Sequence, residues 1–154
     1  MATIPFGSAT DENLVEAIAQ IWQWSNFQTQ KSLAVRYGGV CGGVLIEVID
    51  EPFTGSVYLN TVWAGKVCDE DLELDAVGNV KRYVLEYLIS KPGGKVGETA
   101  VYRKEVNDIS TAIYIDDKLE DERFHLYGFA PAVWIKFIDL GGTVGDNSVR
   151  ECNR

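Results

Sequence analysis

The chain has 154 residues, of which 14 are basic and 23 are acidic, so its formal net charge at pH 7 is −9. Hydrophobic residues make up 46% of the chain, which excludes intrinsic disorder and predicts a globular domain. The negative charge would repel phosphates, so we expect no direct binding to nucleic acid. No apolar run approaches the ~20 residues that a transmembrane helix needs, so we also expect no membrane partner.

The distribution of apolar and polar stretches predicts three segments. Residues 1–10 form an N-terminal arm, residues 11–142 form a single β-rich domain with an N-terminal helix, and residues 143–154 form a polar C-terminal tail. Ile4 and Phe6 are apolar side chains on an arm that is too short to build its own core. We therefore expect both chain ends to pack on neighbouring subunits rather than on their own domain.

The first predicted element is an amphipathic helix at residues 11–25. Asp11 and Glu12 suit the positive end of the helix dipole. An apolar stripe follows at helical spacing and consists of Leu14, Val15, Ile18, Ile21 and Trp22. We expect this stripe to lie over a sheet or to cap a barrel. The alternative is that it packs on another subunit, together with Trp24 and Phe27.

After Phe27 the hydrophobic period changes from 3.6 to 2, which is typical of β-strands. Strands are expected at residues 33–37, 44–50, 56–63, 81–89, 98–106, 109–115, 124–129 and 132–138. Residues 116–123 are mostly charged and are interpreted as a loop. The connections are too short for helical crossovers, so neighbouring strands should be antiparallel. The sequence thus predicts a mainly β fold, an antiparallel β sandwich or barrel of about seven to eight strands with one N-terminal amphipathic helix.

The core of this fold should consist of the apolar side chains on the inward faces of these elements. They are Ile18, Ile21, Leu45, Val48, Val57, Leu59, Val84, Leu88, Val101, Ile113, Ile115, Leu126, Val133 and Ile135. The chain also has four tryptophans, more than a core of this size needs. Some of them are therefore expected at an interface, where Trp and Tyr supply much of the binding energy.

No combination of residues predicts catalysis, a cofactor or a metal site. His125 is the only histidine, and no nucleophile motif accompanies it. Cys41, Cys68 and Cys152 form no CxxC pair and are interpreted as free thiols. Two acidic clusters are interpreted as solvated loops, with a Ca²⁺ site as the alternative for the first. They comprise Asp69, Glu70, Asp71, Glu73 and Asp75, and Asp116, Asp117, Glu120, Asp121 and Glu122.

These observations predict a non-enzymatic structural or interaction protein of a symmetric assembly. The class that fits a small, acidic, β-rich chain is a phage-like virion component, such as a capsid decoration protein or a tail or connector protein. Its partners would be copies of itself, as a homo-oligomer, and other assembly proteins, and it would be made in the cytoplasm and incorporated into a virion. The interface is expected at Ile4, Phe6, Trp22, Trp24 and Phe27.

Two alternatives remain open on the sequence alone. One is a β-barrel that binds a small apolar ligand in a cavity lined by Trp63, Tyr83, Tyr87 and Trp134. The other is an acidic inhibitor or immunity-type protein, whose net charge would speed its association with a basic partner.

Overall fold

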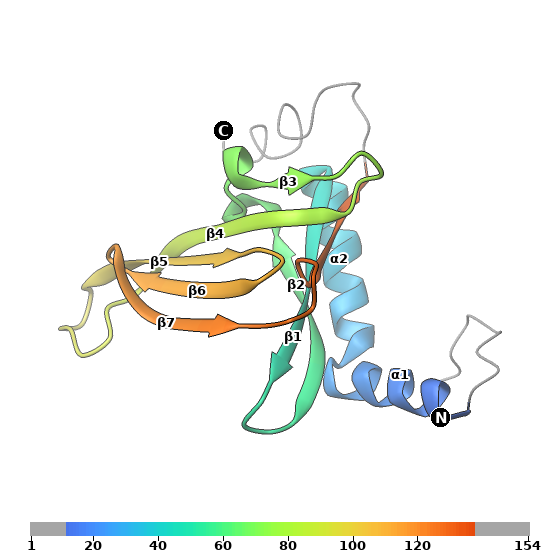
Figure 1. The fold of residues 1–154 in the computed structure, drawn as a ribbon. Coiled ribbons are helices and arrows are strands. Elements are labelled where there is room, and N and C mark those ends of the chain that lie inside the picture. Colours follow the sequence, from blue (N-terminus) through green and yellow to red (C-terminus); the bar gives the residue numbers. More distant parts are fainter. Residues whose placement is uncertain (1–11, 138–154) are drawn as a thin grey trace.

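The computed structural model describes residues 12–137. Two N-terminal helices are followed by eight strands, which pair antiparallel in two open sheets. The smaller sheet has the strand order β2-β1-β8, and the larger has the order β3-β4-β5-β6-β7. The two sheets cross at a steep angle, and the helices lie beside the smaller one (Figure 1). The antiparallel pairing is confirmed, whereas the predictions of a barrel and of a single helix are wrong.

The two helices precede all eight strands along the described part of the chain. The helices are α1 (Glu12–Trp24) and α2 (Phe27–Cys41). The strands are β1 (Gly43–Glu51), β2 (Ser56–Trp63), β3 (Glu73–Leu74), β4 (Val80–Ser90), β5 (Thr99–Val106), β6 (Ser110–Ile115), β7 (Lys118–Phe124) and β8 (Ala132–Lys136). Two 3₁₀ turns, η1 (Ala64–Lys66) and η2 (Asp69–Asp71), connect β2 to β3. No helix in the part of the chain that the structure describes is long and apolar enough to cross a membrane.

Helix α2 replaces the strand that the sequence predicted at residues 33–37. Its buried positions are Ala34, Gly38 and Cys41, which lie on one face at helical spacing. These side chains are small, so the helix can approach the sheet closely, and a Cβ on Gly38 would collide with the Phe137 ring. The packing of this face outweighs the glycine penalty of about 1 kcal/mol per residue. Gly42, with φ of 74°, then ends the helix immediately before β1.

Two hydrogen bonds connect the corner between α1 and α2 to the outer edge of β2. The Ser25 hydroxyl oxygen accepts a 2.8 Å hydrogen bond from the Leu59 backbone N–H. The Gln30 side-chain oxygen accepts a 2.8 Å hydrogen bond from the Thr61 backbone N–H. The helices therefore satisfy two backbone donors of β2 that no strand pairs.

The end of the larger sheet also differs from the prediction. The charged run that was expected to be a loop contains β7, which is the edge strand of this sheet. Asp116 and Asp117 both have positive φ and form a two-residue hairpin turn between β6 and β7. Charged side chains are common on edge strands, because they discourage pairing with other chains. The predicted strand at residues 124–129 is wrong, since only its first residue belongs to a strand.

The main core lies between the two sheets, where they cross. Its buried members are Leu45, Val62, Val67, Leu72, Val80, Tyr83, Leu85, Val106 and Ala130. Among the predicted core residues Leu45 and Val84 are buried, and seven others are partly buried. The prediction is wrong for the five exposed ones, which are Val48, Leu88, Leu126, Val133 and Ile135. A closed barrel or full sandwich would have covered these positions, whereas open sheets leave part of their apolar faces uncovered.

Candidate functional site

The predicted interface residues of the described region lie at the corner between α1 and α2. Trp22 and Phe27 are half-buried and stack on each other, with ring centroids 4.4 Å apart and an interplanar angle of 14°. Trp24 does not join this stack, and 46% of it is exposed. Ile4 and Phe6 lie outside the described residues. The stack fixes the corner, which leaves Trp24 as the member of the set that a partner can reach.

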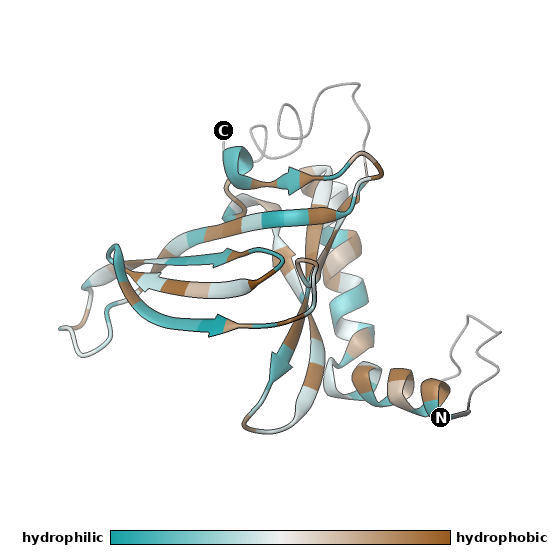
Figure 2. Cartoon of the chain, in the orientation of Figure 1, coloured by the Kyte–Doolittle hydropathy of each residue, from teal (hydrophilic) through white to brown (hydrophobic). Residues whose placement is uncertain are grey.

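Helix α1 carries an apolar surface that is only partly used within the domain. The helix extends beyond the smaller sheet (Figure 1), and apolar residues recur along it (Figure 2). Leu14 and Val15 are exposed, and Ile18 is half-buried. We call these three residues the α1 surface. The apolar stripe of α1 therefore extends beyond the portion of the helix that packs on β2.

A second group of exposed apolar residues runs from the end of β7 to β8. Its members are Phe124, the last residue of β7, Leu126 and Phe129 of the segment between the two strands, and Val133 of β8, and we call them the connector surface. Leu126 is 99% exposed and Phe124 is 72% exposed. The segment is nevertheless held in place, because the Tyr127 hydroxyl donates a 2.8 Å hydrogen bond to the Asp50 carboxylate. Large apolar side chains that are both exposed and anchored are typical of a binding surface.

A recess adjoins the connector surface. It has a volume of about 750 Å³. Phe129 and Val133 line one part of it. The charged residues of its lining are Lys81 and Arg82 of β4 together with Glu73, Asp75 and Asp108. The Arg82 guanidinium is held by the Asp71 carboxylate at 2.8 Å. A recess of this size accommodates a large side chain or a short helical segment of a partner.

His125 lies within the same segment. Its ring stacks on Tyr127 with centroids 4.5 Å apart, and its backbone N–H donates a 2.7 Å hydrogen bond to the Ile109 carbonyl oxygen. Both ring nitrogens are buried without a hydrogen-bond partner among the described residues. No serine, threonine or cysteine of residues 12–137 therefore forms a nucleophile–base pair with His125.

A polar cleft opens where the two sheets diverge beyond the core. Its volume is about 530 Å³. The lining side chains come from α2, β1, β2, η1, β4 and β5, and include Tyr37, Glu47, Asn60, Trp63, Lys66, Tyr87, Tyr102 and Lys104. Four residues were predicted to line a cavity for an apolar ligand, and two of them, Trp63 and Tyr87, line this cleft. Tyr83 belongs to the core and Trp134 packs against it, so the predicted set is divided.

Glu47 forms the floor of the cleft, with a side chain that is only 3% exposed. Its Oε1 accepts a 2.8 Å hydrogen bond from the Tyr83 hydroxyl and a 2.6 Å bond from the Lys104 ammonium. Its Oε2 accepts a 3.0 Å bond from the Asn60 amide. Each partner comes from a different strand, so one carboxylate joins β1, β2, β4 and β5.

Glu47 was not among the predicted site residues, although its position in the sequence carries a signal. The carboxylate stands in the middle of a nearly continuous apolar strand, residues 44–50. A charged residue at such a position is buried only when it is paired. The complementary signal is Lys104, at an inward position of the alternating strand β5.

Members of both acidic clusters make structural contacts in the described region. Asp75 accepts hydrogen bonds from the Val77 and Asn79 backbone N–H groups, and Asp116 pairs with Lys91 at 3.5 Å. No group of three or more His, Cys, Asp or Glu within residues 12–137 could hold a metal ion. Cys41 and Cys68 are free, whereas Cys152 lies outside the described residues.

Comparison with protein-family models and with curated proteins finds no match. The candidate surfaces must therefore be interpreted from their own geometry and chemistry.

Proposed function

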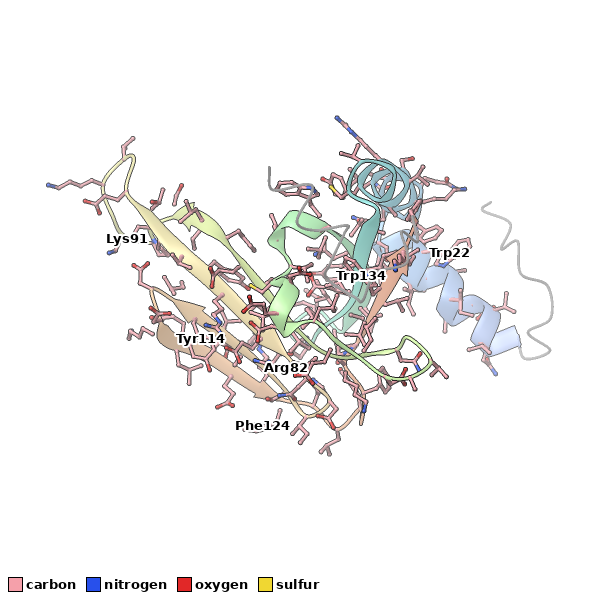
Figure 3. The ribbon with its side chains drawn as sticks, turned by 90° about the horizontal axis from the view of Figure 1, so that it is seen from above. Trp22, Arg82, Lys91, Tyr114, Phe124 and Trp134 are labelled. Carbon is pink, nitrogen blue, oxygen red and sulfur yellow. The ribbon has the colours of Figure 1, made fainter. Side chains whose placement is uncertain are left out.

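We propose that this chain is a non-enzymatic structural subunit of a symmetric homo-oligomer, and that the assembly is a virion, as a capsid decoration protein or a tail or connector protein. The observation that carries the proposal is the pair of exposed apolar surfaces on one chain. Helix α1, which carries the α1 surface and on which Trp22 is labelled, lies on a different side of the molecule from Phe124 of the connector surface (Figure 3).

Two different surfaces on one chain favour a head-to-tail contact. In such a contact one surface of each copy meets the other surface of the next, and the series closes into a ring when the rotation permits. Burying an exposed side chain such as Leu126 or Phe124 contributes roughly 1.5–3 kcal/mol before the cost of ordering. The occupant we propose for the connector surface is thus the α1 surface of a neighbouring copy.

The charges of the two segments are complementary. Helix α1 contains two acidic residues, Glu12 and Glu16, and no basic residue. Residues 124–137 contain Lys136 and no acidic residue, in a chain with 23 acidic residues. The net charge of −9 would oppose association of copies elsewhere on the surface. Residues 124–137 themselves therefore do not repel an acidic helix, and Lys81 and Arg82 partly offset the acidic residues Glu73, Asp75 and Asp108 at the adjoining recess.

Native mass spectrometry of the full chain and of two variants tests the proposal. The wild type should form a closed oligomer, and Leu126→Asp should shift it to the monomer, because a carboxylate would be buried in the contact. Leu88→Asp is the matched control, since Leu88 is also exposed but lies on β4, outside both surfaces. A monomeric wild type, or a Leu126→Asp variant that assembles like the wild type, would contradict the proposal.

A mixing experiment distinguishes a head-to-tail contact from a two-fold symmetric one. Leu14→Asp disrupts only the α1 surface, and Leu126→Asp disrupts only the connector surface. Each variant alone should be monomeric, but a mixture should form a heterodimer through the one intact pair of surfaces. If the mixture stays monomeric, the two surfaces do not meet. Mass spectrometric detection of the chain in purified phage particles tests the virion assignment.

A further inference from the structure

The polar cleft carries one positive charge in excess. The Glu47 carboxylate is neutralised by the Lys104 ammonium at 2.6 Å. Lys66 lies with its Nζ 4.0 Å from the centroid of the Tyr87 ring, and no carboxylate of the described residues lies within 4.0 Å of that ammonium. The cation is therefore held against an aromatic ring at the wall of a cleft, in a chain with a net charge of −9.

The cleft also offers two phenol hydroxyls, those of Tyr87 and Tyr102, as hydrogen-bond donors. Burial raises the pKa of Tyr102 to about 12 and raises the pKa of Tyr87, so both hydroxyls keep their protons at neutral pH. Neither hydroxyl donates to a described residue of the chain. Glu47 already accepts three hydrogen bonds from its neighbours. A molecule that enters the cleft thus meets an ammonium group and two phenol donors.

We propose that this cleft binds an organic carboxylate through Lys66, with hydrogen bonds from the hydroxyls of Tyr87 and Tyr102. A single negative charge matches the single excess positive charge. A doubly charged anion such as phosphate fits less well, because Lys104 is already paired with Glu47 and the lining of the cleft offers no second positive charge in excess to balance it. The aromatic rings of Tyr87, Tyr102 and Trp63 give the carbon skeleton of the ligand an apolar surface.

The volume of about 530 Å³ is within the range of small-molecule sites. The carboxylate can come from a free small molecule or from an Asp or Glu side chain of a protein partner. The site would use the same chemistry in both cases. This inference is independent of the proposed assembly, since the cleft contains no residue of the α1 surface or of the connector surface.

Ligand-observed NMR on the full chain tests the proposal with benzoate as the probe and benzamide as its neutral isostere. Benzoate should bind, benzamide should bind about tenfold or more weakly, and phosphate should not compete with benzoate. Lys66→Gln should weaken benzoate binding about tenfold or more, because a charge-assisted hydrogen bond is lost. Lys95→Gln is the matched control, since Lys95 is exposed in the turn between β4 and β5.

A short capped peptide of alternating Asp and Ser distinguishes the two sources. If it displaces benzoate at a lower concentration than free benzoate needs, the natural ligand is a protein side chain; the reverse indicates a free carboxylate. The proposal is overturned if benzamide binds as tightly as benzoate, if Lys66→Gln binds benzoate like the wild type, or if benzoate does not bind.

Discussion

The Tyr83 hydroxyl donates a 2.8 Å hydrogen bond to the Oε1 atom of Glu47, and thereby connects β4 of the larger sheet to β1 of the smaller one. Tyr83 is 1% exposed and Glu47 is 2% exposed, so neither group can exchange its partner for water. The bond therefore contributes to the relative placement of the two sheets, beyond the non-directional packing of the core around it.

Removing this hydroxyl should destabilise the fold without disturbing its packing. Tyr83→Phe should lower the free energy of unfolding by about 1.5–3 kcal/mol, because the bond is to a charged acceptor. Urea unfolding followed by circular dichroism measures the change. Tyr114→Phe is the control, since the Tyr114 hydroxyl donates to no described residue, and it should change stability by less than about 0.5 kcal/mol. Equal effects of the two variants would show that Tyr83 acts through its ring alone.

The tyrosines between the sheets should make the fold sensitive to alkaline pH. Burial raises the pKa of Tyr102 from 10.0 to about 12, and it also raises the pKa values of Tyr83 and Tyr87. The unfolded chain therefore releases these protons at lower pH than the folded chain does. Their contribution to stability is fully present below pH 10 and is lost as the pH rises through 10 to 12.

Urea unfolding at a series of pH values checks this dependence. The wild type should lose stability progressively above pH 10, and Tyr102→Phe should lose less over the same interval. The difference in the free energy of unfolding between the two proteins at pH 7 is subtracted from the difference at each higher pH. This removes the part of the change that does not depend on pH. If the two proteins have the same slope above pH 10, the Tyr102 hydroxyl is in contact with bulk water.

Two leucines that the sequence analysis placed together in the core should respond differently to truncation. Leu45 is fully buried between the sheets, whereas Leu88 is 68% exposed on β4. Leu45→Ala should lower the free energy of unfolding by about 2–5 kcal/mol, since it leaves a cavity. Leu88→Ala should change it by less than about 0.5 kcal/mol. A large loss for Leu88→Ala in thermal unfolding would mean that a partner or another segment covers β4.

Deletion of residues 1–10 tests the predicted role of the arm, which lies outside the described residues. The shortened chain should fold, because residues 12–137 contain a connected core cluster of nine buried residues. It should assemble less completely than the full chain, since Ile4 and Phe6 would no longer contribute apolar contacts to a neighbour. Analytical ultracentrifugation measures the change. Assembly equal to that of the full chain would show that the arm is dispensable.

The sequence was sufficient for those elements whose hydrophobic period is clear. Strand β2 has the predicted bounds, and β1, β4, β5 and β6 differ from theirs by one or two residues. The prediction failed at α2, where residues 33–37 were assigned to a strand. Local preference could not show that Gly38 lies against the Phe137 ring, which is a contact between distant parts of the chain.

The candidate site was predicted less well than the fold, for a related reason. Trp24 is exposed, and its role at an interface stays a prediction, whereas Leu126, which was assigned to the core because it lies in an apolar run, is 99% exposed. Hydrophobic periodicity indicates which apolar side chains share one face of an element, but it does not show whether another element covers that face. Glu47 is a different case. One charge within an apolar strand indicates that it is paired when buried, but its partners could not be identified, because they lie on three other strands.

The hydrogen bonds from the β2 edge to Ser25 and Gln30 have a consequence for how the smaller sheet can grow. Those two side chains occupy the positions where an incoming strand would have to pair, and the helix corner blocks its approach. A strand donated by another chain could therefore extend this sheet beside β8 but not beside β2. Because the smaller sheet can add a strand at one edge only, copies of the chain cannot pair edge to edge through this sheet in an unlimited cross-β ribbon.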